Sequence, residues 1–214
     1  TSDGKPIKGN NSGNGLREDG VFVVRLFNFS APSADLFRDA LRKFIFSGSD
    51  KLVLDLRGNP GGYLEAAVDM ASWFLPSGKV IVSEEFGTNS NQAPNIHRSK
   101  GYNIFDPKVL KMAILIDKGS ASASEILAGA LNEHGVAKLV GEKSFGKGSV
   151  QELIPVTGDT FLKITVAKWM TPNGHSISDF GLTPDIIVPI TKEDIAAGKD
   201  PQLERAAKLL ISGK

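Results

Sequence analysis

The sequence predicts an α/β fold in which helices pack against a sheet, with α+β elements toward its end. Two segments, 52–75 and 113–134, share one plan: a short apolar strand, a turn of small residues, and an apolar-periodic helix. A pair of strand patterns at 150–154 and 160–169, joined through a Gly-containing turn, adds an antiparallel region. In open α/β sheets functional sites lie beyond the carboxyl ends of strands, where both small-residue turns are expected.

Periodicity, capping residues and turn residues define the expected elements. Ser33 can cap a helix, Pro76 stops one, and Gly135 suits the position just after a helix end. The expected strands are 21–27, 52–56, 80–84, 110–116, 137–141, 150–154, 160–169 and 186–189, and the expected helices are 34–46, 63–75, 122–134 and 200–212.

Two stretches lack such patterns. Residues 1–20 are polar and rich in Gly and Asn, which predicts a linker before a single unit at 21–214. Residues 86–108 are polar and too long for a routine connection, which predicts a functional or mobile loop.

Composition excludes several function classes. A net charge of +1 gives no electrostatic case for nucleic acid or membrane, and no apolar run is long enough to span a bilayer. The absence of cysteine excludes disulfides and Cys nucleophiles, and it fits an oxidising, extracytoplasmic compartment. The three histidines have no metal-ligand spacing, so we predict neither a metal site nor a cofactor.

Ser122 has two interpretations. Ser122 and Glu125 fit a capping box at the start of a helix, which is a purely structural role. The second interpretation is a nucleophile, because a helix N-terminus favours developing negative charge and the neighbours Ala121 and Ala123 leave room for a substrate.

Lys147, between two glycines, is the candidate base. To act as one it must be neutral, which requires burial or nearby positive charge. The turn at 58–62 can offer a backbone N–H to an oxyanion. Asp55 and Arg57 are expected to form an ion pair that pins this turn.

Three other chemistries fit the residues less well. The run from Gly141 to Lys147 nearly matches a P-loop, but it lacks the Ser or Thr that holds Mg²⁺ and is followed by a strand. A Ser-His-Asp triad has no Gly-x-Ser-x-Gly elbow, although His175 could reach inward; His134 is three helical turns from Ser122. No carboxylate pair suggests a metal-assisted hydrolase.

Four segments in order resemble the C-terminal processing peptidases, also called tail-specific proteases. They are Asp55–Gly62, Gly119–Glu125, Gly141–Gln151 and Gly181–Asp185, and the likeness covers about residues 20–212. The resemblance implies a crotonase/ClpP-like core and a serine endopeptidase that needs no cofactor and cuts near apolar C-termini of proteins.

The resemblance also implies a role for each site residue. Ser122 is the expected nucleophile, Lys147 the general base and Gln151 the residue that orients the lysine. The backbone N–H groups of Gly62 and Ala123 are expected to form the oxyanion hole. If 147–151 enters a strand, Lys147 and Gln151 share a face. Glu133, where some members carry Asp, is expected to be structural.

One feature of the family has no counterpart here. Its members usually carry a peptide-binding PDZ domain, and residues 1–20 could be only its edge or a linker in its place. Members mostly work outside the cytoplasm, so a periplasmic or cell-envelope location is expected, with a targeting segment removed. The alternatives are a catalytically silent relative that binds peptides or apolar ligands, and an enzyme at rest with Lys147 displaced.

Overall fold

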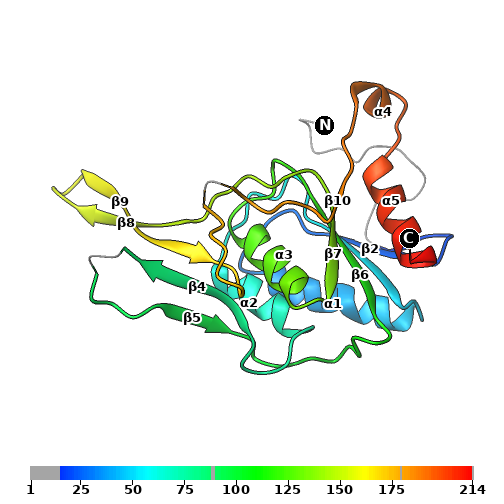
Figure 1. Ribbon diagram of the computed structural model, residues 1–214, viewed down its shortest axis with the longest axis horizontal. Helices are drawn as coiled ribbons and strands as arrows, with labels where there is room; N and C mark the ends of the chain where they lie inside the picture. Colours follow the sequence, from blue (N-terminus) through cyan, green and yellow to red (C-terminus); the bar gives the residue numbers. More distant parts are fainter. Residues whose placement is uncertain (1–14, 88–89, 179, 214) are drawn as a thin grey trace.

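Two sheets organise the chain in the computed structural model, which describes residues 15–87, 90–178 and 180–213 (Figure 1). The larger sheet has six strands in the order β1-β2-β3-β6-β7-β10, and the smaller has four in the order β5-β4-β9-β8. The fold is therefore mixed α/β, as the sequence predicts.

The larger sheet is parallel except at one edge, where β1 runs antiparallel to β2. Its central strands are short, apolar and buried, as expected for a parallel sheet covered on both faces. The strands are β1 (Gly15–Leu16), β2 (Phe22–Arg25), β3 (Lys51–Asp55), β6 (Lys111–Ile116), β7 (Ala137–Gly141) and β10 (Ile186–Ile187).

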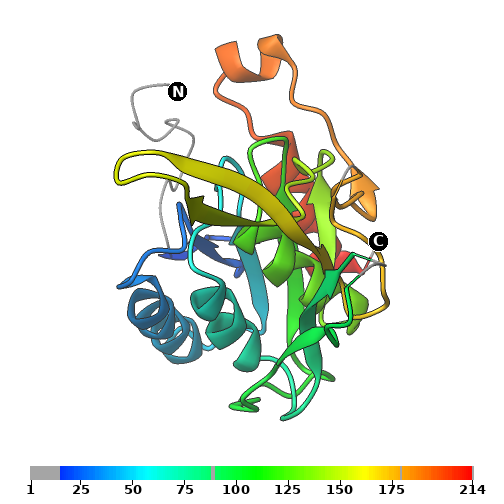
Figure 2. The same ribbon diagram turned by 90° about the vertical axis from the view of Figure 1, so that its left-hand side faces the viewer.

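Helices cover both faces of this sheet. Helices α1 (Ser33–Phe46), α2 (Leu64–Ser72) and α3 (Ala123–Glu133) share one core with alternate strand residues such as Leu54 and Ile114. Helix α5 (Pro201–Ser212) packs against the intervening residues, including Val53 and Leu115, on the other face (Figure 2). The chain thus forms three layers, with the carboxyl ends of β3 and β6 beside each other in register.

The smaller sheet is antiparallel and extends away from the helices. It contains β4 (Val80–Phe86), β5 (Asn95–Arg98), β8 (Ser149–Pro155) and β9 (Phe161–Met170). Strands β8 and β9 form an arm that projects from the body (Figure 1). No described helix is long and apolar enough to cross a membrane.

Three local expectations need correction. Residues 15–20, expected as linker, form β1 and a turn; residues 1–14 lie outside the described part. The expected irregular stretch 86–108 contains β5, which pairs with β4. A short helix, α4 (Lys192–Ala196), was not expected and is capped by Thr191, whose side chain accepts from the Asp194 N–H. Each is a short element with too few apolar residues to show a period.

Candidate active site

Ser122 holds an unusual backbone conformation at the start of α3. Its φ is 56° and its ψ is −118°, whereas a capping residue ordinarily has extended dihedrals. Among the described residues other than glycine, only Asn103 shares a positive φ. Such strain costs of the order of 1–3 kcal/mol and persists where the surroundings impose it, most often at functional sites. Helix capping alone does not require this geometry.

The two neighbouring serines have structural roles. The buried Ser120 hydroxyl donates to the carbonyl of Leu56 at 2.9 Å, and the buried Ser124 hydroxyl donates to the carbonyl of Asn59 at 2.9 Å. Both bonds fasten the turn after β6 to the turn after β3. Ser122 is the only one of the three that is partly exposed.

The glycine turn after β3 lies directly against Ser122. A Cβ added to Gly61 would fall 2.8 Å from the Ser122 Cβ and 2.9 Å from the Ala123 nitrogen, so only glycine permits this approach. Among the described residues, neither the Gly62 N–H nor the Ala123 N–H has a hydrogen-bond acceptor. The structure therefore places both predicted oxyanion donors beside the Ser122 turn with their N–H groups free.

Asp117 and Asn59 hold these two turns together, a role that the sequence analysis did not predict for either residue. Asp117 Oδ1 accepts from the N–H groups of Gly58 and Gly119, each at 2.8 Å. The buried Asn59 side chain donates to the Leu26 carbonyl at 2.8 Å and accepts from the Gly61 N–H at 2.9 Å. An Asx residue after each strand could have signalled this bracing.

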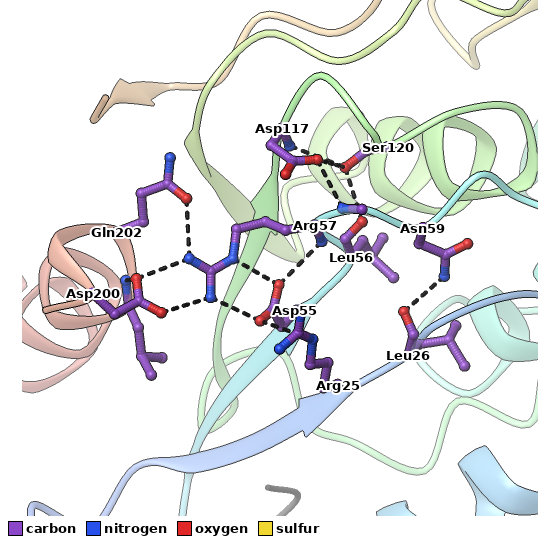
Figure 3. A network of polar contacts seen from close by, with 12 residues as sticks. Arg25, Leu26, Asp55, Leu56, Arg57, Asn59, Asp117, Ser120, Asp200 and Gln202 are labelled. Carbon is purple, nitrogen blue, oxygen red and sulfur yellow. Dashed lines mark hydrogen bonds and ion pairs between the residues drawn. The ribbon is translucent and has the colours of Figure 1, made fainter. Parts of the chain in front are cut away.

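The expected Asp55–Arg57 ion pair is confirmed and is part of a larger network (Figure 3). The Arg57 guanidinium makes two hydrogen bonds with Asp55, at 2.9 and 2.8 Å, and two with Asp200, both at 2.8 Å. Its fifth N–H reaches Gln202 Oε1 at 3.1 Å. All five donors are thus used, and the start of α5 is fastened to the residue just before the glycine turn at 58–62.

The charges of this network stabilise one another. Burial alone would lower the pKa of Arg57, but the hydrogen bonds and charges of Asp55 and Asp200 outweigh it and raise that pKa. Burial alone would raise the pKa of Asp200, but its hydrogen bonds and attraction to Arg57 lower it.

Glu125 links Ser122 to the turn at residues 144–148, here called the lysine turn. This fully buried carboxylate accepts from the Ser122 N–H at 2.9 Å and from the Lys147 N–H at 3.0 Å, both on Oε2. The predicted capping-box arrangement is therefore present. The same side chain reaches a turn 22 residues later in the chain, which the capping motif did not signal.

Among the described residues, no hydrogen bond joins the Lys147 side chain to Ser122 in this conformation. It is exposed, and its amine takes part in no hydrogen bond or ion pair among the described residues. The burial that is one of the two ways to keep this amine neutral is therefore not present in this conformation. Its backbone lies close to the nucleophile nonetheless, because the Ser122 and Lys147 nitrogens share one acceptor and so lie within about 6 Å of each other.

The expected alignment of Gln151 with Lys147 depends on residues 147–151 entering one strand. Strand β8 begins at Ser149, after the lysine, and its pairing with β9 shifts between Val150 and Gln151. The extra residue at this shift is Val166 on β9, so β8 keeps its own alternation, but Lys147 lies in the turn before the strand and need not share a face with Gln151. The Gln151 side chain is exposed on the arm.

The histidines lie away from Ser122. His134 Nε2 bonds to the Val80 carbonyl at 2.7 Å, and His175 Nδ1 lies 2.9 Å from Glu133 Oε1. Glu133 is eleven residues beyond Ser122 on α3, roughly 16 Å along the axis. Glu133 also accepts from the Thr171 hydroxyl at 2.7 Å, which gives it the predicted structural role. A His-based triad on Ser122 is not formed.

The site therefore combines a strained serine, two free N–H groups at a helix N-terminus and glycine turn, and a lysine whose backbone is near. This set suits acyl transfer. The model of peptidase family S41 matches residues 20–188. The chain belongs to this family.

Two relatives have names that describe proteases. One, from Staphylococcus aureus strain N315 and named a probable CtpA-like serine protease, is 38% identical over 172 residues, 80% of this chain. A carboxyl-terminal-processing protease of Synechocystis is 37% identical over 196 residues, 90% of this chain. The chain spans only 34% and 44% of their respective lengths.

The fold of this S41 chain also matches solved structures. The photosystem II D1 C-terminal processing protease aligns with a TM-score of 0.71 and 27% identity, over 94% of this chain and 50% of that one. A peptidase structure from Parabacteroides merdae, 19% identical, aligns with a TM-score of 0.76 over 97% of this chain and 68% of that one, which supports the fold alone.

Proposed function

We propose that this chain is the catalytic core of a serine endopeptidase that cleaves proteins near their C-termini. The observation that carries the proposal is the strained, partly exposed Ser122 at a helix N-terminus, pressed against a glycine turn with free N–H groups. Membership of family S41 and the names of its processing-protease relatives support the reaction class.

In the proposed reaction, neutral Lys147 removes the proton from the Ser122 hydroxyl, which attacks the peptide carbonyl. The Gly62 and Ala123 N–H groups stabilise the oxyanion, each worth about 3–4 kcal/mol by analogy with measured oxyanion donors. The tetrahedral intermediate collapses to an acyl-serine as the peptide C–N bond breaks and the protonated lysine donates its proton to the leaving amine. Water then releases the acyl group. Gln151 would orient the lysine amine.

Lys147 must turn inward for this chemistry. Its backbone nitrogen is held within about 6 Å of the Ser122 nitrogen by the shared carboxylate oxygen, and its flexible four-carbon stem carries the amine. Rotation about side-chain bonds therefore suffices in principle, with no movement of the turn. Bound substrate would exclude water and favour the neutral amine.

The proposed substrates are proteins with exposed, apolar C-termini, processed outside the cytoplasm. The names of the relatives support C-terminal processing, and the absence of cysteine fits an oxidising compartment. The exposed aromatic residues Tyr63 and Phe145 flank the site, next to Gly62 and within the lysine turn, and could contact apolar side chains.

Cleavage of an unfolded protein with an apolar C-terminus tests the proposal. We expect Ser122→Ala and Lys147→Ala each to abolish cleavage, because one removes the nucleophile and the other its base. Lys143→Ala is the matched control for Lys147→Ala, since Lys143 is exposed and lies over the Phe180 ring. Cleavage that persists in Ser122→Ala would overturn the proposal, and binding without cleavage by the wild type would favour a silent relative.

A further inference from the structure

Four donors converge on the buried carboxylate of Glu125, in the first turn of α3. Oε2 accepts from the N–H groups of Ser122 and Lys147, at 2.9 and 3.0 Å. Oε1 accepts from the Ser144 hydroxyl at 2.6 Å and the Gly146 N–H at 2.7 Å. One side chain thus satisfies three backbone groups and a hydroxyl from two separate turns.

These contacts fix the lysine turn from one side, and neighbouring segments fix it from the other. The Ser144 hydroxyl also accepts from the Leu182 N–H at 2.6 Å, and the Phe145 N–H donates to the Ser120 carbonyl at 3.0 Å. A Cβ added to Gly148 would fall 2.1 Å from the Ser178 nitrogen, so the turn has no room to shift toward that segment. The described contacts leave Glu125 as the one side chain bonded to both Ser122 and Lys147.

We propose that Glu125 is a positioning residue that sets the separation of the nucleophile turn and the lysine turn. This rests on the proposed function of Ser122 and Lys147. Because both backbone nitrogens bond to the same oxygen, neither turn can move without straining the bond to the other. Glu125 acts through these backbones and does not touch the reacting atoms.

The position also explains why a carboxylate is needed there. An isosteric amide offers one oxygen and one NH₂ group, so in either orientation at least one backbone N–H faces another donor. A buried donor left without an acceptor costs about 1–3 kcal/mol, or roughly fivefold to 150-fold in an equilibrium. A carboxylate offers acceptors on both oxygens and avoids this conflict.

The test compares Glu125→Gln and Glu125→Ala with Asp185→Asn and Asp185→Ala. Asp185 is a matched control, because it also accepts three donors, from Asn132, Lys138 and Leu139, but outside the two turns. Well below the melting temperature, we expect kcat to fall about tenfold in Glu125→Gln and about a hundredfold in Glu125→Ala, with KM within about threefold. The folded Asp185 variants should keep the wild-type kcat.

A second readout does not need activity. Hydrogen exchange at the Gly146 and Lys147 amides should accelerate in both Glu125 variants and stay unchanged in both Asp185 variants. Folded Glu125 variants with wild-type kcat and wild-type protection at these amides would overturn the inference. Faster exchange in a protein whose wild type never cleaves would support the coupling while contradicting the proposed function, so the two failures are distinguishable.

Discussion

At the scale of single residues, the unusual backbone conformation of Ser122 is explained by the groups that surround it. Its positive φ is imposed by a helix start on one side, the glycine turn on the other, and a buried carboxylate that holds its N–H. Its backbone dihedrals thus differ from the extended ones that a capping residue ordinarily has, although Glu125 still accepts from its N–H. The surrounding bonds of Ser120, Ser124 and Asn59 supply the stability that offsets this cost.

Gly61→Ala tests this contact. A Cβ there would fall 2.6 Å from the Ala121 carbonyl and 2.8 Å from the Ser122 Cβ, at a φ of 96°. We expect it to destabilise the protein by about 2–4 kcal/mol and to abolish reaction of Ser122 with a fluorophosphonate probe. Urea unfolding and labelling rates measure the two effects.

Gly135→Ala is the matched control, because Gly135 has a φ of 73° and nothing within 4 Å of an added Cβ. It should carry only the backbone cost, about 1 kcal/mol, and keep full labelling. Wild-type labelling in Gly61→Ala would show that the tight contact is not needed.

Residue types and spacing could predict Ser122, Lys147 and the glycine turn as candidates, but not their geometry. The Ser-x-x-Glu pattern predicts a capping box, and the structure contains one. It could not predict that Glu125 also holds Ser144, Gly146 and Lys147, because those contacts depend on how distant turns pack. The outward Lys147 side chain was equally unpredictable, since rotamers of exposed lysines follow no sequence pattern.

At the scale of elements, helix α5 is attached to the site through its first turn. Asp200 caps the helix by accepting from the Leu203 N–H at 3.0 Å. It also binds Arg57, which directly precedes the glycine turn at 58–62. Gln202 strengthens this attachment of α5, because its side chain also donates to the Val188 carbonyl at 2.7 Å. The helix start and the turn therefore share one set of polar contacts (Figure 3).

Acid should weaken the contact between Asp200 and Arg57 that attaches α5 to the site. The pKa of Asp200 is lowered in the folded state, so its stabilisation is present above the unfolded pKa, about 4, and is lost as the pH falls through the folded value. Asn also caps helices, so Asp200→Asn removes chiefly the bonds to Arg57, at a cost of about 2 kcal/mol at pH 7. Urea unfolding from pH 7 to pH 3 should show the wild type losing its advantage over the variant.

Asp39→Asn serves as the comparison, because its ion pair with Arg42 is exposed and contributes little. Its unfolding should follow the wild type across the range. A constant difference between wild type and Asp200→Asn down to pH 3 would contradict the assigned role of the carboxylate.

Elements with strong periodicity could be predicted, and weak ones could not. Helix α1 and strand β7 fall where the apolar pattern places them. Strand β5 is Asn-Ile-His-Arg, which has no alternation of apolar residues and exists because it pairs with β4. The start of β8 at Ser149 likewise depends on its pairing with β9, and it leaves Lys147 outside the strand that the expected alignment with Gln151 required.

At the scale of the whole molecule, a rigid sheet carries the site and a protruding arm continues from it. The residues at 52–54 and 113–116 are almost fully buried, whereas both faces of the arm expose apolar residues, including Leu153, Phe161 and Leu162. The lysine turn joins these two regions, since β8 starts two residues after Lys147. Local stability should therefore fall from the sheet toward the arm.

Hydrogen exchange of the intact chain should display this gradient. We expect amides at 52–54 and 113–116 to exchange most slowly and those at 151–164 to exchange first, because the arm buries little apolar surface. Measurement at two protein concentrations controls for self-association. Protection in the arm equal to that of the sheet, at both concentrations, would contradict this description.

The site is most directly tested by locating the covalent adduct that a fluorophosphonate forms with the wild-type chain, by peptide mass spectrometry. We predict a single adduct on Ser122 that is lost in Lys147→Ala and retained in Lys143→Ala. An adduct on another serine, or labelling of Ser122 that is unchanged without Lys147, would contradict the assignment of this pair.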